Sequence, residues 1–158
     1  IHRGRHLLSD ELALIDPATL AITPLARPVS LKNESLRVIR AFEPSAVLNQ
    51  ETRETTKGTV THMRVPAEHL ARLGETAQPR WVVFPRFVAG SDADLRPRAK
   101  ADSMLELARN GFNYSLLGRT AFDALAGVID TSDCYEFSYS RLDDAVAVFD
   151  RLAADSQS

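Results

Sequence analysis

Two adjacent carboxylates near the start of the chain are the residues best suited to chemistry. Asp10 and Glu11 lie between two short apolar runs, at residues 7–8 and 12–15. This pattern predicts a buried strand over residues 6–8 that delivers the two acids to its carboxyl end, followed by a second strand, formed by the second apolar run, that leaves the site. Ligands bind at strand ends in open α/β sheets, and paired acids there can hold Mg²⁺ or accept a proton. The alternative is a solvated corner between two strands, because Ser9 and Asp10 are ordinary turn residues.

One of the four histidines, His62, is a second candidate for proton transfer. The segment from Thr59 to Val65 alternates in polarity and predicts a strand that carries this side chain on one face. An unperturbed imidazole titrates near neutral pH, which suits a general base. A packed, hydrogen-bonded histidine is the alternative, because a lone histidine in a strand commonly has that role.

The composition limits the classes of protein to which this chain can belong. Its 158 residues, of which 44% are hydrophobic, suit one globular domain with a sizeable core. The formal net charge of -2 gives no basic footprint for nucleic acid. Apolar runs such as residues 81–84 are too short to span a bilayer. The single cysteine, Cys134, excludes an internal disulfide, agrees with a reducing, cytoplasmic compartment, and is expected to be buried in a strand.

The hydrophobic pattern predicts the elements that must position these residues. We expect further strands at residues 20–24, 29–31, 59–65, 80–87 and 134–139, and helices at 33–42, 66–74, 99–108, 121–129 and 142–153. Asn33 and Thr120 are expected to cap the helices that they begin. Segments 45–57 and 90–97 are expected to be loops. Together these elements predict an α/β fold with a mixed sheet and flanking helices.

Several familiar catalytic signatures are absent from the sequence. There is no zinc-type Cys/His spacing, no Gly-x-Ser-x-Gly elbow and no dinucleotide glycine fingerprint. There is also no Gly-x-x-x-x-Gly-Lys-Ser/Thr phosphate loop within these residues. A complete nucleotide site would therefore need residues outside this sequence.

Short motifs spread over nearly the whole chain resemble one family of kinases. They lie at residues 3–11, 27–33, 53–56, 60–63, 73–74, 79–85 and 102–114. In residues 3–11, Arg-Gly is followed by a short apolar run and two adjacent acids. This series resembles the HPr serine kinase/phosphorylase family, and most closely the HprK-related kinase A branch found with exosortase and exopolysaccharide genes.

The resemblance implies a P-loop kinase fold of the HPr kinase and phosphoenolpyruvate-carboxykinase type. The family's strand, phosphate loop and helix would then lie upstream of Ile1. Residues 1–4 would form the last turn of that helix, with Gly4 at its left-handed cap. Residues 1–158 are therefore expected to be a single α/β kinase-like domain that represents the C-terminal part of such a kinase.

The resemblance also implies roles for individual side chains. Asp10 matches the acid that acts as base toward the acceptor hydroxyl, and Glu11 matches a metal- or phosphate-side acid, where the family usually has Asp. Arg53 matches a loop arginine near the phosphates, and Lys57 is a second cation in the same loop. Cations around the phosphate oxygens are what phosphoryl transfer requires. A solvated polar loop is the alternative for Arg53 and Lys57.

The expected function is thus an ATP- and Mg-dependent kinase in the cytoplasm. Its acceptor would be a protein serine or a small molecule, with a link to exopolysaccharide systems implied by the resemblance. Neither nucleic acid nor membrane is expected as a partner, and a homo-oligomer is compatible with a family that often forms rings of six. The alternative is a non-catalytic nucleotide-sensing or partner-binding module derived from the same fold.

Overall fold

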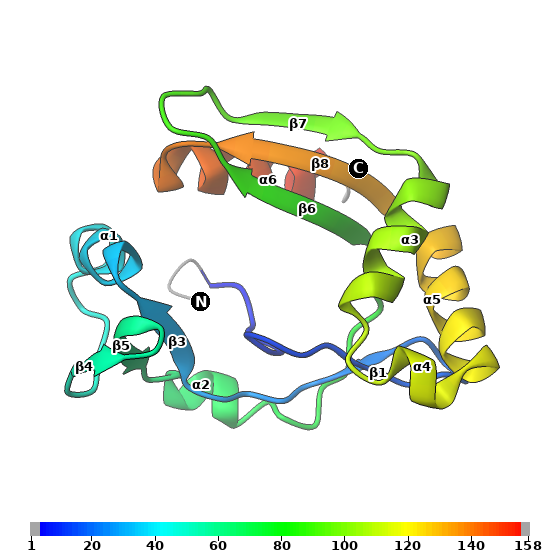
Figure 1. Cartoon of the computed structure of the whole chain (residues 1–158), viewed down its shortest axis with the longest axis horizontal. Coiled ribbons are helices and arrows are strands. Elements are labelled where there is room, and N and C mark those ends of the chain that lie inside the picture. Colours follow the sequence, from blue (N-terminus) through cyan, green and yellow to red (C-terminus); the bar gives the residue numbers. More distant parts are fainter. Residues whose placement is uncertain (1–3, 156–158) are drawn as a thin grey trace. The chain divides into compact units, whose positions relative to one another are not determined.

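A computed structural model describes residues 4–155 and confirms the α/β class (Figure 1). The described residues form six helices and three small sheets, where the sequence predicted one mixed sheet. The chain divides into two compact units. Unit 1 comprises residues 1–16 and 21–77, and unit 2 comprises residues 17–20 and 78–158. The assignment of residues 1–158 to a single kinase-like domain stays a prediction.

Unit 1 is built on a three-stranded antiparallel sheet in the order β3-β5-β4. Its elements are β1 (Leu14–Ile15), β2 (Ile22–Thr23), β3 (Val29–Lys32), α1 (Glu34–Phe42), β4 (Thr52–Thr55), β5 (Gly58–Met63) and α2 (Ala67–Leu70). The core forms where Leu31, Leu36 and Met63 pack together, so α1 covers one face of this sheet. The other face of the sheet, which carries Ser30 and His62, is not covered by α1 and can hold a binding site.

The strand predicted at residues 6–8 is absent, which corrects the expected approach to the two acids. Instead of a ladder, the backbone there makes single bonds to separate partners. The Leu7 N–H donates to His69 Nδ1 at 3.1 Å, and the Leu8 carbonyl accepts from the Leu25 N–H at 2.8 Å. An apolar run of two leucines is too short to compete for a place in a sheet. The predicted last helical turn at residues 1–3 lies outside the described residues, whereas Gly4 has a φ of 75°, the expected left-handed conformation.

Unit 2 holds a second three-stranded sheet, in the order β6-β8-β7, with a parallel β6–β8 pair and an antiparallel β7–β8 pair. Its elements are β6 (Trp81–Phe87), β7 (Asp94–Pro97), α3 (Lys100–Asn110), α4 (Tyr114–Leu117), α5 (Arg119–Thr131), β8 (Asp133–Tyr139) and α6 (Leu142–Asp155). Phe137 packs against Ala145 and Val148 of α6, so α6 covers one face. Cys134 is buried in β8, as predicted.

Several local predictions were wrong for identifiable reasons. Strands β4 and β7 lie in segments predicted to be loops, and both are edge strands whose polar residues carry little apolar alternation. Strand β6 was expected to be covered on both faces, yet its last three residues are exposed. Neither predicted helix cap forms, because Asn33 makes no side-chain bond to its helix and α5 begins before Thr120.

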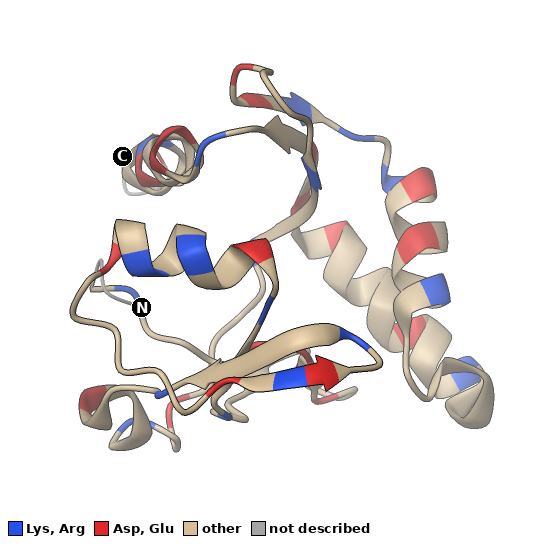
Figure 2. Cartoon of the chain, turned by 60° about the vertical axis from the view of Figure 1, so that its left-hand side comes forward, with Lys and Arg blue, Asp and Glu red and all other residues tan. Residues whose placement is uncertain are grey.

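The helices of residues 4–155 are also informative about membranes. None of them combines the length and the apolar character that a bilayer crossing demands. The longest helix, α6, begins with two acidic residues, Asp143 and Asp144, in its first turn. Figure 2 shows Lys and Arg interspersed with Asp and Glu along the helices and strands.

Candidate functional site

The polar face of the unit 1 sheet is hollowed, and most of the residues predicted to do chemistry line that hollow. The cavity measures about 550 Å³. Asp10 and Glu11 line it together with Lys57 and His62, although these residues come from three different segments of the chain. The remaining lining residues are Ser9, Leu12, Leu25, Arg27, Pro28, Ser30, Lys32, Asn49 and Val60. We call this the unit 1 hollow.

Asp10 is anchored to the free edge of strand β3. Its Oδ2 accepts the backbone N–H of Ser30 at 3.0 Å. Ser30 lies opposite His62 on the neighbouring strand β5. The Ser30 N–H points away from β5, so the two residues form a non-hydrogen-bonded pair, the type of antiparallel pair whose side chains lie closest together. The exposed imidazole of His62 therefore lies on the same face as Ser30, and the anchored carboxylate of Asp10 lies at its edge.

The turn that carries Lys57 is held by the side chain of Asn33. The Asn33 Nδ2 donates to the Lys57 carbonyl at 3.2 Å, and Asn33 Oδ1 accepts the Thr59 N–H at 3.1 Å. Between these two residues Gly58 has a φ of 83°, and a Cβ at that position would collide with Asn33 Oδ1. A glycine is therefore required here, both for its conformation and for the close approach of Asn33.

The charges around the unit 1 hollow suit an anionic ligand. Three cations, Arg27, Lys32 and Lys57, line it with only two carboxylates, which leaves one positive charge in excess. All three cations are exposed. The backbone N–H of Lys32 is already bonded to Ser35 Oγ at 2.8 Å, which fixes the strand from which this side chain projects. Such an arrangement can bind phosphate oxygens while a nearby carboxylate accepts a proton.

The structure places Arg53 apart from the other predicted site residues. It lines a separate shallow hollow with Arg40 and residues 49–51, and Asn49 is shared between the two hollows. The Arg53 Nη2 lies 3.8 Å from Glu51 Oε2, and 79% of its side chain is exposed. Its predicted role beside the phosphates stays a prediction that no contact in unit 1 yet supports.

The side chains available as metal ligands can be compared with the predicted binding of Mg²⁺. In residues 4–155 no group of three or more His, Cys, Asp or Glu side chains is arranged to hold a metal ion. Asp10 and Glu11 offer two carboxylates, and Mg²⁺ usually takes one or two carboxylates with substrate phosphates and waters as its other ligands. The residues present therefore fit a metal that arrives with a nucleotide rather than one held by a cage of protein ligands.

A buried histidine fixes the segment that leads to Asp10. His69 of α2 accepts the Leu7 N–H, and its Nδ1 lies 3.2 Å from Nδ1 of His6, whose ring stacks on it. Burial lowers the pKa of His69 below its usual value. The imidazole is thus neutral at neutral pH, as its role as a hydrogen-bond acceptor requires.

Sequence reasoning found the acids, Lys57 and His62 by residue type, but it missed three contributors. All three lie in the family-like motif at residues 27–33, but Arg27 and Ser30 were assigned no role, and Asn33 was interpreted as a helix cap. The alternation of Ser30 and Lys32 along β3 was the one available signal, because it places both residues on one face. Comparison with protein-family models, with curated proteins and with solved structures finds no match to this chain.

Proposed function

We propose that this chain carries the acceptor-binding part of an ATP- and Mg-dependent kinase, which transfers a phosphoryl group to a hydroxyl of a protein serine or a small molecule. The observation that supports this most is the meeting of Asp10, Glu11 and Lys57 in one hollow of about 550 Å³. Ligand pockets usually measure about 300–1,000 Å³, so the space suits a phosphorylated ligand or an acceptor group.

Each lining residue has a role in this proposal. Asp10 keeps one carboxylate oxygen on the Ser30 N–H, and its other oxygen accepts the proton of the acceptor hydroxyl. Lys57, Lys32 and Arg27 bind phosphate oxygens. Bound Mg²⁺ would neutralise charge on those oxygens, and Asp10 and Glu11 are the carboxylates that would hold it.

The wider proposal follows the resemblance described above. The chain would belong to a P-loop kinase of the HPr kinase type, act in the cytoplasm beside exopolysaccharide systems, and assemble as a homo-oligomer. Arg53 would approach the phosphates only if strand β4 moves, because it lies beside Glu51 in a separate hollow.

Titration with Mg-ATP of the ¹⁵N-labelled protein from the complete reading frame tests this proposal, because residues 1–158 contain no phosphate loop. Residues 1–158 alone are expected to bind Mg-ATP weakly or not detectably. For the complete protein we expect saturable shifts at Lys32, Lys57 and His62, and about tenfold weaker binding in Lys57→Gln, since one charge-assisted contact is lost. Arg119→Gln, which removes a surface cation of unit 2 that is 91% exposed, is the matched control and should bind as the wild type does. Shifts confined to other residues, or equal weakening in both variants, would refute the assignment of the site.

The non-catalytic alternative has one observation in its favour. Asp10 already has a structural role at the edge of β3, because it accepts an N–H that the sheet leaves unpaired. A nucleotide sensor would bind Mg-ATP in the same hollow, yet wild type and Asp10→Asn would both lack turnover. A kinase would lose turnover in Asp10→Asn and keep binding.

A further inference from the structure

A second polar hollow lies on the unit 2 sheet, on the face opposite to α6. Register places Phe84 beside Glu136 and Arg96, and Arg86 beside Ser138 and Asp94, all on this face. These residues line a cavity of about 530 Å³ together with Arg98, which follows β7. We call it the unit 2 hollow. It shares no lining residue with the unit 1 hollow.

Arg98 is the most constrained cation of this hollow. Its backbone N–H bonds to the Cys134 carbonyl at 2.8 Å, which extends the β7–β8 ladder and fixes the start of α3. Only 19% of its side chain is exposed, and its guanidinium carbon lies 4.3 Å from the centre of the Phe84 ring. The ring and the backbone therefore hold this guanidinium in one place.

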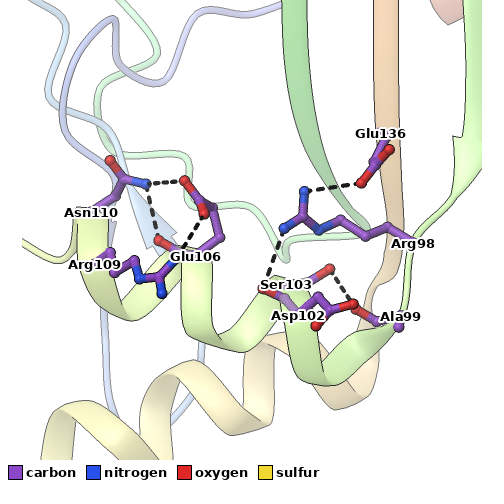
Figure 3. Close-up of polar contacts among 8 residues, drawn as sticks. All are labelled: Arg98, Ala99, Asp102, Ser103, Glu106, Arg109, Asn110 and Glu136. Carbon is purple, nitrogen blue, oxygen red and sulfur yellow. Dashed lines mark hydrogen bonds and ion pairs between the residues drawn. The ribbon is translucent and has the colours of Figure 1, made fainter.

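The hydrogen-bonding capacity of Arg98 is poorly used by the protein. Nη1 lies 3.4 Å from Glu136 Oε1, and Nη2 lies 3.5 Å from the Asp102 carbonyl oxygen (Figure 3). Both contacts exceed the usual 2.7–3.2 Å, and the buried Nε has no hydrogen-bond partner in residues 4–155. A guanidinium carries five donors and cannot lose its charge, so an oxyanion that aligns better with Nη1 and Nη2 would improve its hydrogen bonding.

The charges of the remaining lining residues favour an anion. Arg96 is neutralised by Asp94, whose Oδ2 lies 2.6 Å from its Nε. Three arginines and two carboxylates line the hollow, which leaves one positive charge in excess. Glu136 is 64% exposed and meets Arg98 only at 3.4 Å, so a better-aligned oxyanion can displace it.

We propose that the unit 2 hollow binds an oxyanion, a phosphate or carboxylate group of a small ligand, through the fork of Arg98. Arg86 supplies a second cation and the Ser138 hydroxyl a neutral donor. Planar bidentate contact is the geometry in which arginine binds both groups most strongly. This binding does not depend on the proposed kinase activity, because every residue involved lies in unit 2 and outside the unit 1 hollow.

The test is titration of the whole chain with inorganic phosphate and, separately, with acetate, at constant ionic strength set with chloride. The readout is the ¹H–¹⁵N shift of the backbone amides of residues 84, 136 and 138, which line the hollow and are retained in every variant. We expect saturation, about tenfold weaker binding in Arg98→Lys, and about threefold weaker binding in Arg86→Gln. Glu136→Gln should bind several-fold more tightly, because the competing carboxylate is gone.

Arg109→Gln is the matched control, since this arginine lies on α3 in the same unit and pairs with Glu106 instead (Figure 3). It should leave the affinity unchanged. Saturation by phosphate alone assigns a phosphate ligand, and saturation by both anions assigns a general oxyanion site. A linear response to both anions, or equal affinities in Arg86→Gln, Glu136→Gln and the control, overturns the proposal even if Arg98→Lys fails to fold.

Discussion

Asp10 Oδ2 lies 3.0 Å from the backbone nitrogen of Ser30, so the acid with the most chemical promise also covers the free edge of strand β3. The two roles can be separated by substitution. Asp10→Ala should lower the free energy of unfolding by about 1 kcal/mol, because an edge N–H loses its partner. Asp10→Asn should keep most of that stability, since its amide oxygen can accept the same bond. Urea unfolding of the three proteins measures the difference, and equal losses in both variants would contradict the anchoring role.

Gly58 should tolerate no side chain. Gly58→Ala places a Cβ against Asn33 Oδ1 in a backbone that already has a φ of 83°. We expect a loss of about 1–3 kcal/mol in the free energy of unfolding. Gly74→Ala is the control, because a Cβ there meets nothing within 4 Å and its φ is ordinary. A loss no larger than that of the control would show that Asn33 does not constrain the Lys57 turn.

The stability of unit 1 should fall on mild acidification. Burial lowers the pKa of His69, and the charges of His6 and Arg72 act in the same direction, while Glu68 opposes them. The unfolded chain therefore binds a proton more readily than the folded chain. This contribution to stability is complete above the usual pKa of about 6.5 and is lost as the pH falls from there toward the folded pKa.

Unfolding experiments between pH 7.5 and pH 5, values chosen to bracket about 6.5, measure this effect. The wild type should lose stability across the range, and His69→Gln should lose less because it cannot titrate. If the free energy of unfolding of His69→Gln depends on pH as strongly as that of the wild type, the pH dependence comes from other groups.

Arg53 of β4 and Lys57 of the turn that follows should differ in their effect on nucleotide binding. Lys57 lines the hollow with Asp10, whereas Arg53 lies in the neighbouring one beside Glu51. Lys57→Gln should weaken Mg-ATP binding about tenfold, and Arg53→Gln less than about threefold, by isothermal titration of the protein from the complete reading frame. The reverse order would mean that the phosphates lie nearer to Arg53, as the resemblance implies, than to the unit 1 hollow.

The helices and strands that the sequence predicted correctly are those with a strong local hydrophobic pattern. Strands β5 and β8 and helices α1, α3, α5 and α6 were expected because their apolar residues recur at the correct period. Strands β4 and β7 were missed because an edge strand is specified by its partner, β5 or β8, more than by its own polar residues. The strand expected at residues 6–8 failed for a different reason, since its two leucines are too short an apolar run and its backbone bonds go singly to Leu25 and His69.

The candidate site was predictable by residue type and not by geometry. Asp10, Glu11 and Lys57 were recognisable as acids and a loop cation, but only the structure shows that they share a hollow. The role of Asn33 was hidden, because its contact with the Lys57 turn depends on the register of β3 on β5. Side-chain bonds between distant segments leave no periodic trace in a sequence.

The central claim is that Asp10 acts as the base for phosphoryl transfer, and the rate constant kcat for transfer from Mg-ATP tests it most directly. The measurement uses the protein from the complete reading frame, with Asp92→Asn as an exposed control in unit 2. We predict that Asp10→Asn lowers kcat by at least about 100-fold while Mg-ATP binding changes less than about threefold. An unchanged kcat in Asp10→Asn, or no turnover in the wild type, would contradict the claim.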